Sequence, residues 1–327
     1  MQLSITEATD LVVRALTRAG MSAHAAGLVA AHLVDAALCG HEFSSLPRTL
    51  AIVEEMRGKP PPGEVRLVRE DRFSAHIDGG DNVAYAVSIV AIDKAVEICG
   101  KHGIAIVTAN NTWFSGRLAY YVERAARQGY VAVHTTNTTA RVAPYGGIER
   151  LMGTNPIAFA FPSEDDPLIV DIGTSSTTWG DVVLARTKGE PLPEGVAVDA
   201  QGRPATDPDA ALEGAFLPWG GQRGSALSLA IQLLGMLAGS APVIHDVSDY
   251  GLFFLLIDPD ALMPGGEYRA RVSELRRTIA ANRPLAGTSK VRVPGDGSLQ
   301  RRREGIAAGT ISLDDRVYRR ILALCDA

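Results

Sequence analysis

The chain has 327 residues, of which 46% are hydrophobic and 21% are charged, a composition typical of a soluble globular protein with one to three domains. Its net charge of −5 gives no overall positive field, so we expect neither nucleic acid nor a membrane as a partner. Three cysteines without paired spacing favour a reducing compartment, and we expect a cytoplasmic protein.

Helical periodicity dominates the beginning of the chain up to about residue 58. A proline-rich run at 59–63 interrupts this pattern and predicts a boundary. Residues 65–77 favour short strands, and the polar run 78–82 favours a turn after them. Further along, the pattern predicts helices over 84–100, 116–128, 225–237, 268–280 and 314–324, and strands over 104–108, 130–135, 157–161, 168–172, 182–185 and 252–257.

This alternation of helices and strands predicts an α/β fold. The chain contains no Gly-x-Gly-x-x-Gly motif, so the usual phosphate-binding loop of a Rossmann domain is absent. Periodicity alone does not determine whether the strands run parallel or antiparallel.

Three loops rich in small and hydroxyl-bearing residues stand out in the second half of the chain. The first, 153–156, leads directly into the apolar strand 157–161; the others are 171–176 and 218–224. Glycine lets a ligand approach the backbone, and hydroxyl and amide groups offer hydrogen bonds to it. In this order the loops resemble those of the type-2 malate/L-lactate dehydrogenase family of NAD(P)-dependent oxidoreductases, which reduce small 2-oxo acids and cyclic 2-imino acids.

The resemblance runs from about residue 6 to the end and implies a fold. It implies a non-Rossmann NAD(P)-binding domain over 76–267, with a predominantly antiparallel sheet flanked by helices. A helical lobe for substrate binding and dimerisation would combine 1–75 with 268–327. The family's habit implies a homodimer, and the cofactor would be NADH or NADPH, with no preference visible in the sequence.

The family's substrate motif reads Gly-His-Asp-Ser-His-Gly, two further residues and Arg, and 40–48 aligns with it without a gap. The resemblance places Arg48 on the arginine that binds the substrate carboxylate, a role that suits two parallel guanidinium donors. It places Phe43 on an orienting serine and Ser44 on the proton-donating histidine, although serine is a poor acid at neutral pH. His41 is either a substitute donor or a structural histidine.

Asp181 matches an aspartate that cyclic-imine reductases of this family carry where malate-like members have lysine. A carboxylate stabilises a cationic iminium, which already holds the proton that a ketone must receive during reduction. The alternative for Asp181 is an ordinary strand-edge turn. The resemblance also implies substrate contacts from Thr154 and from Trp113; Trp113 or Phe114 replaces a family histidine, and either ring lines the site or packs in the core.

Cofactor contacts are implied for five segments. Arg223 keeps the charge of the family's lysine and suits a phosphate, and 294–296 matches a loop that closes over the cofactor. We find no histidine or cysteine spacing typical of a metal site. The residues expected to contact the cofactor are Asn111, Phe114, Ser115, Gly116, Asn155, Asp171, Ile172, Gly173, Thr174, Ser175, Gln222, Arg223, Gly224, Pro294 and Gly295.

Three hypotheses for function follow. The first is NAD(P)H-dependent reduction of Δ1-pyrroline-2-carboxylate to L-proline, with Δ1-piperideine-2-carboxylate as a further substrate. The second is a dehydrogenase of a linear 2-hydroxy acid such as malate, lactate or ureidoglycolate. The third is a dinucleotide-binding homologue that has lost catalysis. Ser44 together with Asp181 separates the first from the second.

Overall fold

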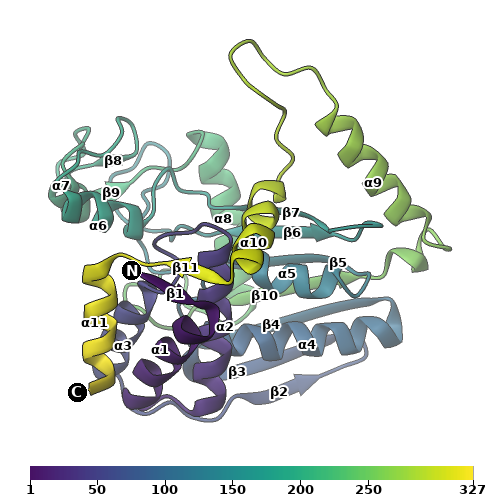
Figure 1. Ribbon diagram of the computed structural model, residues 1–327, viewed down its shortest axis with the longest axis horizontal. Helices are drawn as coiled ribbons and strands as arrows, with labels where there is room; N and C mark the ends of the chain where they lie inside the picture. The colour runs from purple at the N-terminus through teal and green to yellow at the C-terminus, as the bar shows by residue number, and fades with distance from the viewer. Residues whose placement is uncertain (327) are drawn as a thin grey trace.

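The computed structural model describes residues 1–326 and is built around one seven-stranded sheet (Figure 1). The strand order is β2-β3-β4-β10-β5-β6-β7. Only β3 and β4 pair in parallel; the other neighbours in this sheet pair antiparallel, which confirms the predicted sheet type. The strands are β2 (Arg66–Glu70), β3 (Ser74–Val83), β4 (Ile104–Trp113), β5 (Val131–Thr136), β6 (Ile157–Phe161), β7 (Leu168–Ile172) and β10 (Leu252–Ile257).

One face of the sheet is covered by α4 (Ala84–His102) and α5 (Ala119–Ala126). Alanines point from the sheet toward these helices, among them Ala105, Ala132 and Ala160, and all three are fully buried. Small side chains let the helices approach the strands closely, so this layer forms the main core.

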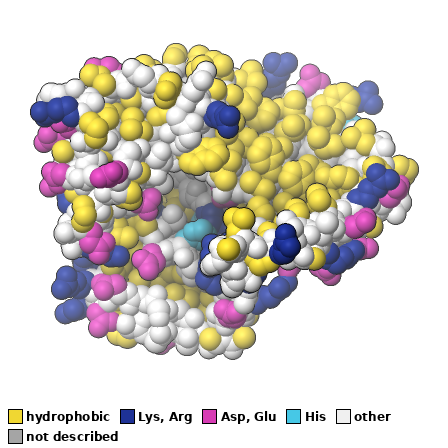
Figure 2. Space-filling view, turned by 90° about the horizontal axis from the view of Figure 1, so that it is seen from above, with side chains coloured by type: hydrophobic (Ala, Val, Ile, Leu, Met, Phe, Trp, Pro, Cys, Tyr) yellow, Lys and Arg dark blue, Asp and Glu magenta, His cyan; other side chains and the backbone are white. Residues whose placement is uncertain are grey.

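The opposite face is apolar but only partly covered by α8 (Gln222–Leu237). Because side chains alternate along a strand, the pairing register places one apolar residue per strand in a continuous row. That row consists of Ile106, Leu255, Val133, Phe159 and Val170. Apolar side chains gather over a broad area on the side of the molecule where α8 and α9 lie (Figure 2).

The helical lobe joins the two ends of the chain. It contains α1 (Ile5–Arg18), α2 (Ala23–Leu38), α3 (Arg48–Arg57) and α11 (Asp315–Asp326), which share a second hydrophobic core. Ser4 caps α1, with a reciprocal bond from Glu7. β1 (Gln2–Ser4) pairs antiparallel with β11 (Thr310–Ser312), which fastens the first residues to the last helix.

β2 belongs to the large sheet, and α3 is the last helix of the lobe before it. The division into domains over 1–75 with 268–327 and over 76–267 stays a prediction. α9 (Glu267–Ala280) projects away from the body, and a long loop returns from it to α10 (Asp296–Ala308), which packs near α2 (Figure 1). Sequence analysis missed α10 because its arginine-rich sequence has no apolar stripe, and Leu299 is its one buried residue.

A third, smaller unit was not predicted. It contains α6 (Trp179–Lys188), α7 (Pro208–Glu213), β8 (Ala197–Val198) and β9 (Ala215–Phe216), and its core includes Val142, Val182 and Phe216. The predicted strand over 182–185 is wrong, because these residues lie inside α6. Two adjacent valines suggested a strand, but the cap at Thr178 starts a helix just before them.

Two predicted loops are also strand. β3 continues through 78–82, and β4 continues to Trp113, beyond the predicted end at 108. A short 3₁₀ turn, Pro259–Ala261, follows β10. Among residues 1–326, no helix combines the length and apolarity that crossing a membrane requires.

Candidate active site

Arg48, at the start of α3, lies among aromatic side chains. Its guanidinium carbon is 3.8 Å from the centroid of the Phe114 ring and 5.6 Å from that of Phe43. Tyr85 is also its hydrogen-bonding partner. Arg48 is half-buried, whereas Tyr85 is buried. The stacked guanidinium is therefore held in a fixed orientation, and its remaining edge is suited to a carboxylate.

Phe43 connects the Arg48 loop to the start of α6. Its ring meets the ring of Trp179 edge to face, with centroids 6.4 Å apart. A side chain added to Gly180 would overlap the Phe43 ring, so this close approach requires glycine. The segments 40–48 and 178–181, distant in sequence, are thus brought together.

Ser44, four residues before Arg48, is half-buried and occupies the position of the expected acid. His41 lies instead in a pocket of about 130 Å³ with Cys39, Arg117 and Gly295. Burial and then the positive charges of Arg117 and Arg301 lower the pKa of His41 to about 4. His41 is therefore neutral at physiological pH, which does not suit a proton donor.

Asp181 lies in the first turn of α6, where its carboxylate has a local partner; its role beside an iminium stays a prediction. It is the third residue of α6, and its carboxylate accepts hydrogen bonds from the Thr178 hydroxyl at 2.7 Å and from the Thr178 backbone at 3.2 Å. The Thr178 hydroxyl in turn accepts from the Asp181 backbone. This reciprocal capping box gives the carboxylate a local structural role.

Trp113 is buried in the core of the helical lobe, with 3% of its surface exposed, rather than lining an open site. Its indole nitrogen donates to the backbone oxygen of Asp81 at 2.9 Å. Phe114, the next residue, has a positive φ of 48° that turns its ring toward Arg48. Of the two aromatic candidates, Phe114 is the one at the site.

The three small-residue loops meet at one end of β6 and β7. The Thr174 backbone donates to the Thr154 oxygen, and the Trp219 backbone donates to the Thr174 oxygen. Ser175 forms a bridge with Pro218. Ile172 and Gly173, between them, are exposed. Backbone hydrogen bonds thus bring the loops 153–156, 171–176 and 218–221 together.

Several polar groups expected to face the cofactor instead hold these loops in place. The Asn155 side chain is fully buried and bonds to Ser228 and Gln232 of α8. The buried Thr174 hydroxyl donates to the backbone oxygens of Thr154 and Asn155. Their side chains are therefore structural, and Thr154, which is half-buried, remains available to a ligand.

The first turn of α8 has the features of a phosphate site. Its N-cap is Gly221, so no side chain caps the free backbone N–H groups of the first turn. Gln222 and Arg223 are exposed there. Gly224 is required because a side chain would overlap the Trp219 backbone. Unpaired N–H groups beside a guanidinium fit the pyrophosphate of a dinucleotide.

The loop at 294–296 lies beside β7, and Gly295 faces Ile169. Gly295 and Asp171 line the same pocket as His41. The Asp171 carboxylate accepts from the Ala119 backbone at 2.8 Å, which anchors this strand end to α5. The predicted C-terminal loop therefore reaches the strand end that carries 171–175.

Four predicted cofactor residues lie along the end of β4 and after it. Asn111 donates its amide to Asp78 of β3 at 2.8 Å and belongs to the sheet. Ser115 is buried, and a side chain at Gly116 would overlap Tyr85, so both are packing positions. Phe114 is the member of this group that reaches the Arg48 site.

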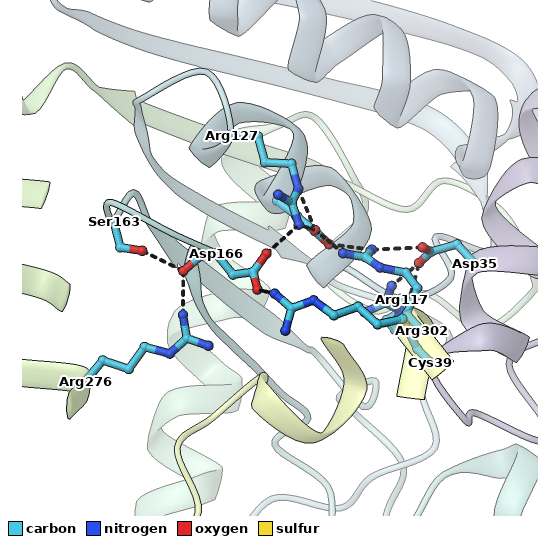
Figure 3. A network of polar contacts seen from close by, with 10 residues as sticks. Asp35, Cys39, Arg117, Arg127, Ser163, Asp166, Arg276 and Arg302 are labelled. Carbon is cyan, nitrogen blue, oxygen red and sulfur yellow. Dashed lines mark hydrogen bonds and ion pairs between the residues drawn. The ribbon is translucent and has the colours of Figure 1, made fainter. Parts of the chain in front are cut away.

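A network of ion pairs ties the lobe to the sheet behind the pocket (Figure 3). Asp35 of α2 pairs with Arg117 and with Arg302 of α10, and Arg302 also pairs with Glu123 of α5. Arg127 connects Glu123 to Asp166. These charges are largely buried and mutually paired, so they fix α2, α5 and α10 relative to one another.

The comparisons with known proteins agree with this arrangement. The profile of the family described as Malate/L-lactate dehydrogenase matches residues 3–322. The chain belongs to this family.

Relatives in the family differ in the substrates their names state. The chain is 31% identical to the L-sulfolactate dehydrogenase of Methanothermobacter thermautotrophicus, over 99% of this chain and 96% of that protein. It is 36% identical to the (2R)-3-sulfolactate dehydrogenase (NADP(+)) of Chromohalobacter salexigens, over 71% and 70%. The crystal structure of the Δ1-piperideine-2-carboxylate reductase from Pseudomonas syringae matches with a TM-score of 0.89 at 28% identity, over 99% of each chain.

This family membership makes the chain an NAD(P)-dependent oxidoreductase of small acids. The free first turn of α8 and the exposed Arg223 fit that cofactor. Among residues 1–326, no cluster of three or more metal-ligating side chains occurs.

Sequence reasoning missed Tyr85, Tyr250 and Gly180. The Tyr250 hydroxyl lies 2.9 Å from that of Thr139, and burial raises its pKa, although the charges of Arg48 and Arg141 oppose the shift. No motif marks either tyrosine, because tertiary packing alone brings them near Arg48. In the sequence, Gly180 is one glycine near a run of small residues, and nothing there indicates its contact with Phe43.

Proposed function

We propose that this enzyme uses NADH or NADPH to reduce a small cyclic 2-imino acid, Δ1-pyrroline-2-carboxylate to L-proline, with Δ1-piperideine-2-carboxylate as a second substrate. The observation that carries the proposal is that Ser44, four residues before the aromatic-stacked Arg48, occupies the position where the family places a histidine acid. His41 is neutral and lies in a different pocket.

The choice of an imine over a ketone depends on the source of the proton in the reduction. A ketone develops alkoxide charge during reduction and needs a nearby acid, whereas an iminium already carries its proton. The nicotinamide, when bound, supplies the reducing equivalent. Arg48 binds the carboxylate, the Phe114 ring restricts water beside it, and the Ser44 hydroxyl orients the imine nitrogen or a water molecule.

The proposal does not rest on the charge of Asp181, because its carboxylate accepts hydrogen bonds from Thr178. The alternative is a dehydrogenase of a linear 2-hydroxy acid, which the names of the sulfolactate-specific relatives favour. In that case a water held by Ser44 would have to deliver the proton.

We also propose that the enzyme is a homodimer formed through the uncovered sheet face and α8. Leu229, Leu233 and Leu237 lie on one stripe of α8 and are more than half exposed. An apolar stripe meets its own copy without like-charge repulsion, and exposed apolar areas of this kind mark interfaces. The cysteines are unpaired, which supports a reducing compartment such as the cytoplasm.

The test of the proposed reaction is oxidation of NADH and of NADPH by the purified enzyme, with Δ1-pyrroline-2-carboxylate, pyruvate and oxaloacetate in parallel. We expect the highest kcat/KM with the imine. Faster reduction of pyruvate or oxaloacetate would replace this proposal with the hydroxy-acid alternative, and the absence of turnover with every acid would favour the inactive homologue.

A further inference from the structure

Two aromatic residues form a wall next to Arg48. Phe43 lies within 5.6 Å of the Arg48 guanidinium and contacts Trp179 edge to face. Both rings are half-buried, so each keeps part of its surface free for a ligand. The wall joins the loop that carries Phe43 to the first residue of α6, Trp179.

Close packing against Gly180 fixes the position of the Phe43 ring. Any side chain at Gly180 would overlap the Phe43 ring, so the start of α6 is shaped to receive it. The capping box of Thr178 and Asp181 fixes that helix start in turn. The wall is therefore a rigid part of the site.

Phe43 departs from the family pattern that the chain resembles, which has serine at this position. Its ring contacts that of Trp179. Two apolar rings therefore lie together at one place, next to Arg48. An anionic group placed against such rings loses hydration without gaining a partner, whereas an apolar group gains burial.

We propose that Phe43 and Trp179 determine specificity by selecting a 2-imino or 2-oxo acid whose remainder is apolar over one that carries a second acidic group. Arg48 binds the one carboxylate, and the wall receives the ring or alkyl part. This inference rests on the proposed function, since it concerns the substrate of that same site, and it predicts a preference different from that named for the sulfolactate-specific relatives.

The test compares two ligands that differ in one group, 2-oxobutyrate and oxaloacetate, in which a carboxylate replaces the methyl group. Dissociation constants are measured by calorimetry with saturating oxidised cofactor, so that no turnover is required. We expect 2-oxobutyrate to bind at least about 10-fold more tightly, in the range that small apolar differences give in enzyme pockets. Equal binding, tighter binding of oxaloacetate, or no binding of either acid overturns the inference.

Variants connect this preference to the wall. F43S and W179R, alone and combined, should weaken 2-oxobutyrate binding about 10-fold and reduce or reverse the preference. The matched control is F73S, because Phe73 is an exposed ring that meets His102 edge to face at the far end of α4. Unchanged preference in the combined variant, with cooperative unfolding retained, overturns the proposal.

Gly180→Ala provides a second route, because it displaces Phe43 without removing a ring. It should reproduce the effect of F43S. If this variant fails to fold, F43S alone still decides. This outcome is separable from the outcome of the proposed reaction. If the enzyme binds 2-oxobutyrate through Phe43 and Trp179 but reduces no imine, the specificity role of the wall stands and imine reduction is refuted.

Discussion

The guanidinium of Arg48 stacks on the ring of Phe114, with 3.8 Å between its central carbon and the ring centroid. Stacking leaves the donor edge of the guanidinium free while it restricts rotation of the side chain. The cost of ordering a long side chain is thus met before the substrate arrives, which favours tight carboxylate binding.

Replacing Arg48 should therefore affect substrate far more than cofactor. We expect R48A to raise KM by a factor that corresponds to about 2–3 kcal/mol, the strength of a hydrogen bond to a charged group. R48K should recover only part of this, because lysine keeps the charge and loses the planar fork. Steady-state kinetics provide the measurement, and R72A is the matched control, since Arg72 is an exposed arginine with its guanidinium 5.0 Å from the ring of Phe73. An unchanged KM would contradict the assignment.

Asp181 and Thr178 offer a comparison that separates structure from catalysis. If Asp181 acts through the capping box, D181A and T178A should each lower the free energy of unfolding by about 0.5–2 kcal/mol and change kcat/KM to the same modest extent. Chemical denaturation and kinetics on both variants give the answer. A much larger loss of kcat/KM in D181A than in T178A would restore the charge role that sequence analysis assigned to Asp181.

Histidine burial should make the fold sensitive to acid. Burial lowers the pKa of His41 to about 4 and that of His134 to about 3, and also lowers that of His32, against an ordinary value of 6.5. The unfolded chain then binds these protons more readily, so stability is complete above pH 6.5 and falls as the pH falls toward 4. Urea unfolding at pH 7.5 and pH 5 should show a smaller loss in H41Q than in the wild type. H24Q, at an exposed position of α2, should behave like the wild type. If H41Q loses as much unfolding free energy between pH 7.5 and pH 5 as the wild type does, the lowered pKa of His41 is contradicted.

The first turn of α8 should control cofactor affinity. R223A should weaken binding of at least one of NADH and NADPH, because a phosphate loses its cationic partner. G224A should weaken both, because the added side chain displaces the loop at Trp219. Calorimetric titration measures both effects. G27A, with open space around it in α2, is the control glycine, and failure of the wild type to bind either dinucleotide would contradict the cofactor site.

Charge placed on the apolar stripe of α8 should prevent self-association. L233E introduces a carboxylate at a position that is 54% exposed, so the monomer should still fold. Sedimentation velocity should show a dimer for the wild type and a monomer for L233E. T187E, near the exposed end of α6, serves as the control. A monomeric wild type would exclude the proposed interface.

The sequence predicted the elements whose signals are local. Leu252–Ile257 was predicted with correct bounds because an apolar run of that length between polar segments indicates a buried strand. α6 was missed because the adjacent residues Val182 and Val183 suggested a strand, although Thr178 before them can cap a helix. α10 was missed because its sequence has no apolar stripe, and tertiary ion pairs such as Arg302 with Glu123 position it.

Where one residue carries one chemistry, as with Arg48, the sequence suggests a role, and that role stays a prediction. The sequence cannot indicate a role where packing decides what a polar group does. Asn155 and Asp181 have the right groups for ligand contacts, but neighbours in space or along the helix engage them first. The Phe43–Gly180 contact joins residues too far apart in sequence for any local pattern to indicate it.

The pairing of β1 with β11 also determines when the enzyme can become active. Gln2 and Ser312 bond across 310 residues of chain, so α1 must wait for α11 while the ribosome makes everything between them. At usual rates of synthesis that interval lasts about 15–60 s, during which the part of α1 that packs against α11 has no final partner. The lobe that begins the chain and bears Arg48 is thus completed last, and a nascent chain can form its sheet long before it can hold a substrate.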